Sequence, residues 1–156
     1  MKEHIKKYLL VLILTIIILI IDQTSKILIA SNMSLGDSFK VINNFFYITH
    51  VNNHGAAWGI MQNQIIILII ITLVALCFLF RFMLTFKSNL RNKIAFGLLF
   101  GGIIGNLIDR VFLGFVRDFL DFRIFGFDFP VFNIGDMAIV IGVALLIFAI
   151  IKGEDK

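Results

Sequence analysis

The sequence has few charged residues and a single cysteine, and both shortages restrict what the protein can be. Asp, Glu, Lys and Arg make up 15% of its 156 residues, whereas hydrophobic residues make up 60%. Soluble domains are on average about one quarter charged. A water-soluble fold of this length exposes too much of its surface to hide so many apolar side chains, so we expect lipid to cover part of it. Cys77 lies inside an apolar run and has no second cysteine with which to form an intrachain disulfide.

Several functional motifs are also missing. There is no P-loop, no G-x-G-x-x-G and no G-x-S-x-G, and the glycines of GGIIGN at 101–106 lie inside an apolar run rather than after a strand. His50 and His54 are four residues apart, but HVNNHG has no glutamate between them and is typical of a turn. The net charge of +4 comes from basic residues that flank apolar runs. We therefore predict no metal, no cofactor and no nucleic-acid partner.

Four apolar runs are long enough, or nearly so, to cross a bilayer as helices, which takes about 20 residues. They cover residues 8–29, 64–86, 93–116 and 133–151. These runs lack the period-two alternation of strands. The sequence therefore predicts an all-α integral membrane protein with four transmembrane helices, organised as a single domain over residues 1–156.

A cleavable signal peptide is the alternative interpretation of the first run, because Lys6 and Lys7 precede its apolar core. Against this alternative, Asp22 and Lys26 are followed by more apolar residues, and no clean small-x-small cleavage site follows the core. We therefore interpret the first run as a transmembrane helix.

The distribution of charge predicts that both termini lie on the cytoplasmic side. Nine of the 14 basic residues precede the first span, surround the short connection between the second and third spans, or follow the fourth span. Basic residues collect in cytoplasmic loops, so an N-in, C-in topology follows. The acidic residues have the opposite bias, and seven of the ten fall outside or at the outer ends of helices: Asp22, Asp37, Asp109, Asp118, Asp121, Asp128 and Asp136.

The two outer connections differ in pattern. Residues 30–61 contain short alternating stretches such as 45–51, which predict a small extracytoplasmic β element between the first and second helices, and Trp58 suits a membrane-interface anchor. Residues 112–132 hold eight phenylalanines. Four of them have helical spacing, which predicts an interfacial helix between the third and fourth spans: Phe112, Phe115, Phe119 and Phe122.

Polar residues inside the predicted spans need an explanation, because a charged side chain costs about 2.5–3.5 kcal/mol at mid-bilayer. Asp22 and Lys26 are four residues apart and share a helix face, so they can form an ion pair. Asn106 and Arg110 have the same spacing. Small residues nearby predict close helix packing: Gly97, Gly101, Gly102 and Gly105.

Asp118 and Asp136 form the most informative pair. The third span runs outward and ends near Asp118, and the fourth span starts inward near Asp136, so a helical hairpin would bring both carboxylates to the same depth. Two adjacent carboxylates do not both ionise cheaply, so one keeps its proton and the pair offers an acid beside a base. Such a pair can hydrolyse a peptide bond by general acid–base catalysis. Interface anchoring or ion pairing is the structural alternative.

Two other functions stay open on the residues alone. A serine–lysine peptidase would use Ser25 with Lys26 or Ser38 with Lys40, although adjacent residues on a helix do not face each other. A non-enzymatic four-helix lipid-binding or transport protein would distribute its polar residues through the membrane. In this sequence they gather near one face.

Five motifs in order resemble those of the lipoprotein signal peptidases, the signal peptidase II or prolipoprotein signal peptidase family. The motifs are DQTSK at 22–26, NHGAAWG at 53–59, GGIIGNLIDR at 101–110, VRDFLDF at 116–122 and FPVFNIGD at 129–136. The resemblance covers essentially the whole chain. It implies a multi-pass aspartyl endopeptidase of the bacterial cell membrane with its active site near the extracytoplasmic face. Such an enzyme removes the signal peptide from diacylglyceryl-modified prolipoproteins by cleaving before the lipidated cysteine.

The resemblance also implies roles for individual residues. Asp118 and Asp136 match the catalytic pair, and the sequence does not distinguish acid from base. The positions that match substrate-binding or supporting residues are Asp22, Lys26, Asn53, Gly55, Gly102, Asn106, Arg110 and Asn133. Gly135 departs from the alanine usual in the family, which loosens the turn but leaves the carboxylate in place. The expected partners are lipid-modified prolipoproteins and membrane lipids, with the protein acting as a monomer.

Overall fold

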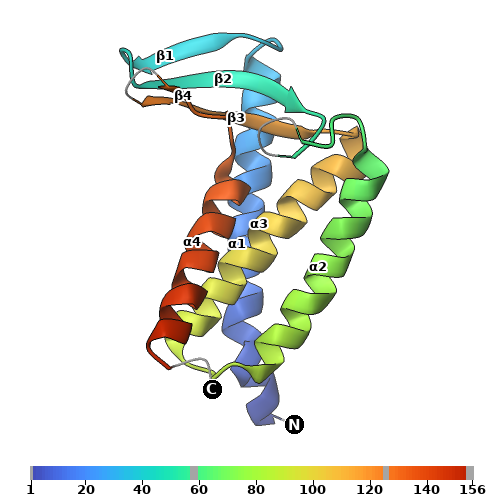
Figure 1. Ribbon diagram of the computed structural model, residues 1–156, viewed down its shortest axis with the longest axis vertical. Helices are drawn as coiled ribbons and strands as arrows, with labels where there is room; N and C mark the ends of the chain where they lie inside the picture. The colour runs from blue at the N-terminus through green and yellow to red at the C-terminus, as the bar shows by residue number, and fades with distance from the viewer. Residues whose placement is uncertain (1, 57–59, 125–126, 154–156) are drawn as a thin grey trace.

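Four helices lie side by side and carry a small antiparallel sheet at one end (Figure 1). The structure, a computed structural model, describes residues 2–56, 60–124 and 127–153. The helices are α1 (Lys2–Asn32), α2 (Ile65–Thr85), α3 (Leu90–Leu113) and α4 (Ile134–Ile151). The start of α1 and the end of α4 lie at the end opposite the sheet. The predictions for Trp58 and for residues 154–156 fall outside the described residues.

Each predicted span corresponds to one helix that is long and apolar enough to cross a membrane. The third helix is shifted toward the N-terminus, because α3 begins at Leu90 and ends at Leu113 rather than covering 93–116. The side chain of Asn89 accepts the backbone N–H of Asn92, which caps the start of the helix. At the other end Gly114 has φ of 80° and donates its N–H to the carbonyl of Arg110. A left-handed glycine of this kind terminates a helix.

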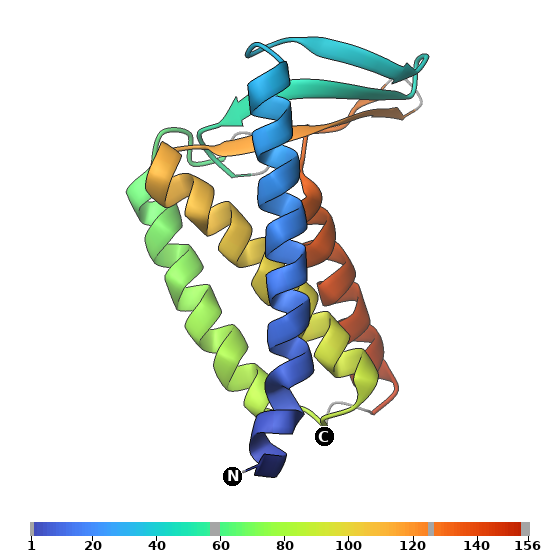
Figure 2. The ribbon, with the colours of Figure 1, turned by 180° about the vertical axis from the view of Figure 1, so that it is seen from behind.

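Helix α3 is the central helix, and it packs closely against α1 and α4 (Figure 2). Glycines make this possible, as the sequence predicts. Gly97 and Gly101 face α1, where an added Cβ would lie 2.6 Å and 2.7 Å from the nearest α1 side-chain atoms. Gly102 faces α4 at Gly135, whose carbonyl oxygen would collide with any added Cβ. The backbones therefore approach at the depth where the functional residues gather.

The outward faces of the helices are apolar. Ile66 and Phe78 on α2 are 75% and 72% exposed, and Val140 on α4 is 68% exposed. In water, so many exposed large hydrophobic residues would be costly, whereas lipid chains solvate them at no penalty. The surface of the bundle therefore matches a hydrocarbon environment.

The sheet contains β1 (Ser38–Ile42), β2 (Phe46–Asn53) and β3 (Val116–Ile124), paired antiparallel in that order. The two-residue β4 (Phe127–Asp128) pairs with the far end of β3. The predicted β element between the first two helices is thus confirmed as β1 and β2. The all-α class is correct for the spans only, because the outer segments form this sheet.

The predicted interfacial helix within residues 112–132 is wrong, because β3 occupies the middle of that segment, residues 116–124. Valine and phenylalanine favour strands when a partner edge is available, and β2 supplies that edge. The ring of Phe122 stacks on Phe46 of β2 with centroids 4.6 Å apart. Helical spacing of the phenylalanines was therefore coincidental, and pairing with a distant strand decided the structure.

Gly142 on α4 provides a test of the close helix packing. An added Cβ would lie 2.7 Å from Leu99 Cγ and 2.9 Å from the carbonyl oxygen of Ala95, both on α3. We expect Gly142→Val to destabilise the protein by about 1–3 kcal/mol through overpacking. Thermal unfolding in detergent measures the effect. Val143→Ile is the matched control, because it adds a methylene one residue along at a lipid-facing position, and equal stability of the two variants would contradict the packing role.

Candidate active site

Asp118 and Asp136 open onto the same cavity, which has a volume of about 750 Å³. Asp118 lies near the start of β3, and Asp136 lies in the first turn of α4. Asp118 is only 2% exposed. The fold thus brings together two carboxylates that are 18 positions apart in the sequence (136 − 118), as the hairpin argument predicts, although a strand rather than a helix carries the first.

Asn133 connects the two carboxylates. Its Nδ2 donates to Asp118 Oδ1 at 2.6 Å, and its Oδ1 accepts the backbone N–H of Asp136 at 2.9 Å. Asp136 Oδ2 in turn accepts the backbone N–H of Asn133 at 3.2 Å, which completes a capping box at the start of α4. One buried amide therefore sets the start of the helix and the position of both acids.

Each oxygen of Asp118 accepts one amide hydrogen bond, from Asn133 and from Asn53, whose Nδ2 lies 3.0 Å from Oδ2. Burial raises the pKa of Asp118 to about 7, and the nearby negative charge of Asp136 adds to the rise, against the lowering effect of the two amides. Asp118 therefore carries its proton up to neutral pH, so the pair holds one proton where an isolated aspartate would hold none.

Lys26 has no exposed surface and is linked to the aspartate pair through Asn106. Its Nζ forms an ion pair with Asp22 at 2.8 Å, as predicted, and donates to Asn106 Oδ1 at 2.8 Å. The ammonium orients this amide, so that Asn106 Nδ2 points the other way and donates to Asp136 Oδ1 at 2.8 Å. The buried cation thus acts on Asp136 through a side chain from α3.

Asp22 has a second role besides its ion pair. Its Oδ1 accepts the backbone N–H of Gly135 at 2.8 Å, which fixes the first turn of α4 against α1. A Cβ at position 135 would lie 3.0–3.1 Å from Asn133 Oδ1, Asp22 Oδ1 and the carbonyl oxygen of Gly102. The glycine found there relieves this crowding, and the hydrogen bond uses only its backbone.

Arg110 lines the cavity and is bonded to Gly55, which is held in turn by Asn53. Asn53 Oδ1 accepts the N–H of Gly55 at 2.9 Å, and Arg110 Nη2 donates to the Gly55 carbonyl at 3.3 Å. A Cβ on Gly55 would lie 2.8 Å from the carbonyl oxygen of Ile60. All eight supporting residues inferred from the resemblance therefore lie around the two aspartates or hold a residue that does.

Three further polar residues beside the site, Gln23, Asp109 and Arg117, bond to one another and were not among the predicted site residues. Asp109 is fully buried and bonds to both of the others. The sequence did contain a signal, since a carboxylate at membrane depth directly precedes Arg110 and needs a cationic partner. The interfacial helix predicted within residues 112–132 does not indicate Arg117 as that partner, whereas β3 places it there.

The serine and histidine alternatives receive no support from the geometry. Ser25 Oγ donates to the Asp22 carbonyl of its own helix at 2.8 Å, and Ser38 Oγ lies 2.9 Å from Thr49 Oγ1 on the exposed hairpin. The Nδ1 of His50 lies 2.9 Å from the Met33 carbonyl oxygen. Within residues 2–56, 60–124 and 127–153 no three His, Cys, Asp or Glu side chains gather as a metal site would require.

Comparison with known proteins agrees with this site. The family model described as signal peptidase (SPase) II matches residues 14–152. A lipoprotein signal peptidase of Staphylococcus haemolyticus (strain JCSC1435) is 48% identical over 154 residues, which cover 97% of this chain and 98% of that protein. One from Staphylococcus aureus (strain bovine RF122 / ET3-1) is 45% identical over 146 residues, which cover 93% of this chain and 90% of the relative.

Two solved structures, each described as a bacterial membrane enzyme, have the same fold. The first has a TM-score of 0.85 and 45% identity, and the match covers 91% of this chain and 87% of that one. The second has a TM-score of 0.83 and 45% identity, with coverage of 91% and 92%. With the family model matching most of its length, the chain belongs to the signal peptidase II family.

Proposed function

We propose that Asp118 and Asp136 are the catalytic pair of an aspartyl endopeptidase that cleaves before the lipidated cysteine of diacylglyceryl-modified prolipoproteins. Family membership makes the protein a membrane protease that processes lipoproteins as a signal peptidase II. It thereby favours a peptidase over the lipid-binding or transport function that the residues alone left open. The observation that carries the aspartyl assignment is that two carboxylates share one cavity and are bridged by the side chain of Asn133.

A pair with one proton is sufficient for hydrolysis. The ionised carboxylate accepts a proton from water while the water oxygen bonds to the scissile carbonyl carbon. The protonated carboxyl group then donates its proton to the leaving amine as the C–N bond breaks. The pair again holds one proton at the end, with the two roles exchanged, so no external acid or base is consumed.

The walls of the cavity support an apolar, extended substrate. The lining includes Ile139, Val140 and Ile141 of α4 and residues 129–132, which follow β4. Val140 is 68% exposed toward the region that lipid occupies, so the cavity adjoins the hydrocarbon surface of α4. Lipid chains and a signal helix would approach along this face. The expected partners are therefore lipid-modified prolipoproteins and membrane lipids.

Removing either carboxylate tests the catalytic pair. We expect Asp118→Asn and Asp136→Asn each to lower the cleavage of a lipidated precursor peptide by at least about 10²–10⁴-fold, because each removes one member of the acid–base pair. Cleavage is measured with purified protein whose thermal unfolding matches that of the wild type. Asp121→Asn on the same strand is the control, since Asp121 bonds to Thr49 Oγ1 outside the cavity. Near wild-type cleavage by either of the first two variants would falsify the assignment.

The pH dependence follows from the proton held by the pair. Because burial raises the pKa of Asp118 to about 7, Asp118 is protonated below that pH and ionised above it. Once both carboxylates are ionised, none can protonate the leaving amine, so we expect kcat/KM to fall as pH rises through about 7. Initial rates at lipidated-peptide concentrations well below KM, between pH 5 and about pH 9, measure this limb, because kcat/KM reports the pKa values of the free enzyme. A kcat/KM that stays constant or rises above neutral pH contradicts the shared proton.

The active site is proposed to face the extracytoplasmic side, with N-in, C-in topology. In a background where Cys77 is replaced by serine, we expect a membrane-impermeant thiol reagent to label Ser38→Cys in intact cells and to spare Ser88→Cys. Ser38 begins β1 in the sheet, and Ser88 lies in the connection between α2 and α3, near basic residues. Permeabilised cells provide the control, where both should react. The reverse pattern would place the sheet in the cytoplasm and exclude the proposed topology.

A further inference from the structure

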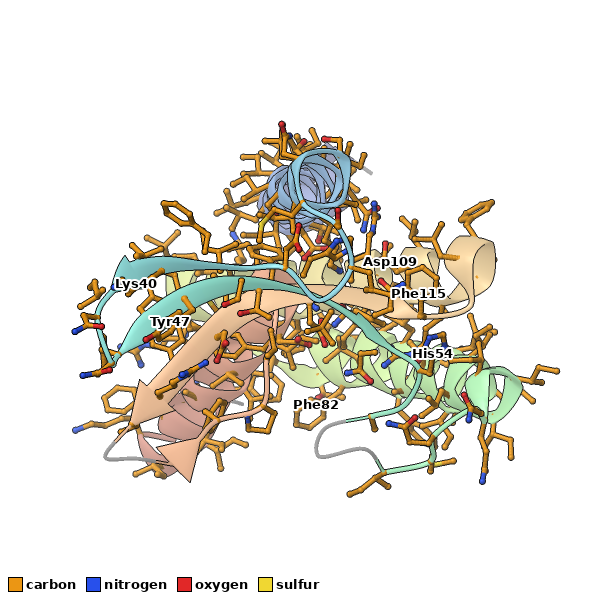
Figure 3. The ribbon with its side chains drawn as sticks, turned by 90° about the horizontal axis from the view of Figure 1, so that it is seen from above. Lys40, Tyr47, His54, Phe82, Asp109 and Phe115 are labelled. Atoms are coloured by element: carbon orange, nitrogen blue, oxygen red, sulfur yellow. The ribbon has the colours of Figure 1, made fainter. Side chains whose placement is uncertain are left out.

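We propose that Asp109, through Arg117, is a positioning residue that fixes the strand backbone directly before Asp118. This inference rests on the proposed catalytic role of Asp118. It concerns a buried polar cluster of Gln23, Asp109 and Arg117, whose side chains do not line the catalytic cavity and come from α1, α3 and β3. Figure 3 shows Asp109 from above, in the space between α1 and the sheet.

Asp109 directs both of its carboxylate oxygens to one residue. Oδ2 accepts the backbone N–H of Arg117 at 3.0 Å and its Nε at 3.1 Å, and Oδ1 accepts Nη2 at 2.7 Å. This is a two-point guanidinium–carboxylate contact with an additional main-chain bond, a geometry that restricts orientation as well as distance. Asp109 has no exposed surface, and the side chain of Arg117 is only 13% exposed.

Gln23 of α1 hydrogen-bonds to both members of the contact between Asp109 and Arg117. Its Nε2 donates to Asp109 Oδ1 at 3.2 Å, and its Oε1 accepts Arg117 Nη2 at 3.1 Å. Lys26 contributes a further positive charge 3.7 Å from Asp109 Oδ2. Both oxygens of Asp109 and the Nε and Nη2 of Arg117 therefore have partners, and the start of β3 is tied to two helices.

The anchor matters because Arg117 and Asp118 are neighbours on a strand. Successive side chains on a strand point to opposite faces, so the face that binds Arg117 determines the direction in which Asp118 points. The ladder between β2 and β3 has an irregularity beside this point, between the pairs Ile48↔Leu120 and Val51↔Asp118. A bulge loosens the local backbone constraint. The hydrogen bonds that Asp109 accepts from Arg117 add a second constraint on the strand beside this irregularity.

Arg117 is the better residue to change in a test. Removing Asp109 would leave Arg117 and part of the charge of Lys26 buried without compensation, a change that commonly unfolds proteins. Replacing Arg117 leaves Asp109 with Gln23, Lys26 and the main-chain N–H of position 117. The fold is then retained while the two-point contact is lost.

We expect Arg117→Met to lower kcat for a lipidated precursor peptide by about 10- to 100-fold, the scale for a small displacement of a catalytic group. The KM should stay unchanged, because Arg117 does not line the cavity. The matched control is Arg123→Met, which removes a cation from the far end of the same strand and should retain wild-type kcat. Arg117→Lys should be intermediate, because an ammonium ion cannot make the two-point contact.

The pH profile separates positioning from partial loss of folded enzyme. The charged groups that act on Asp118 are Asp136 on α4, Lys26 on α1 and Arg110 on α3, and the variant changes none of them. A displaced Asp118 is better hydrated, so we expect the alkaline limb of kcat/KM to move to lower pH in Arg117→Met. A smaller folded fraction would scale kcat/KM equally at every pH and leave the limb in place.

The outcomes that overturn the inference are distinct from failure of the proposed function. Wild-type kcat in Arg117→Met, or a reduced kcat with an unshifted limb, would overturn the positioning role. If Arg117→Met does not fold, wild-type kcat in Arg117→Lys would overturn it. Asp118→Asn is assayed in the same series: its activity would refute the catalytic pair itself, whereas its inactivity beside an unaffected Arg117→Met refutes only the positioning role.

Discussion

The structure depends on the burial of one ammonium group, that of Lys26, among helices that are apolar enough to span a membrane. Lys26 has no exposed surface, and hydrocarbon offers nothing to solvate its charge, so the protein must surround it with acceptors. Those acceptors come from two helices, with Asp22 one turn earlier on α1 and Asn106 on α3. A buried charge tolerates few alternative arrangements of its partners. The need to satisfy Lys26 therefore fixes the position of α1 along α3.

The same requirement extends to the fourth helix and to the proposed catalytic pair. Asn106 presents its carbonyl oxygen to Lys26, so its amide hydrogens are available to Asp136. Asp22 uses its second oxygen for the backbone of Gly135, immediately before that carboxylate. If Asp22 only neutralised Lys26, it would not need this second contact with the start of α4. The network therefore pre-organises the first turn of α4, and in the proposed mechanism no reorganisation is needed when charge moves between the two acids.

The two carboxylates are held in different ways, which is consistent with their different surroundings. Asp136 belongs to a helix start, where a capping box and an amide from α3 fix it. Asp118 belongs to a strand, where amides from Asn53 and Asn133 fix the side chain and the contact between Asp109 and Arg117 fixes the backbone. Rigid elements on both sides of one cavity are what a reaction with two precisely placed proton-transfer groups requires.

The spans could be predicted from the sequence because run length and hydrophobicity are local properties. The juxtaposition of Asp118 and Asp136 was also predictable, since two spans joined by a short outer connection must form a hairpin. The ion pair of Asp22 with Lys26 followed from helical spacing alone. Each of these inferences needs only the geometry of a single helix or of two consecutive ones.

What the sequence did not reveal depends on strand pairing between distant segments. Phenylalanines at helical spacing favoured a helix near position 119, and only the edge of β2, more than 60 positions earlier in the chain, makes the strand more stable (118 − 51 = 67 for one pair). That error also concealed the partner of Asp109, because on a helix Arg117 would have pointed elsewhere. Alternation along a strand places Arg117 against the helices and Asp118 against the cavity. The placement of Arg117 and Asp118 therefore depends on the pairing of β2 with β3, which no local pattern in the sequence indicates. The one local indication was the carboxylate of Asp109 inside an apolar run, which needs a cationic partner from another element.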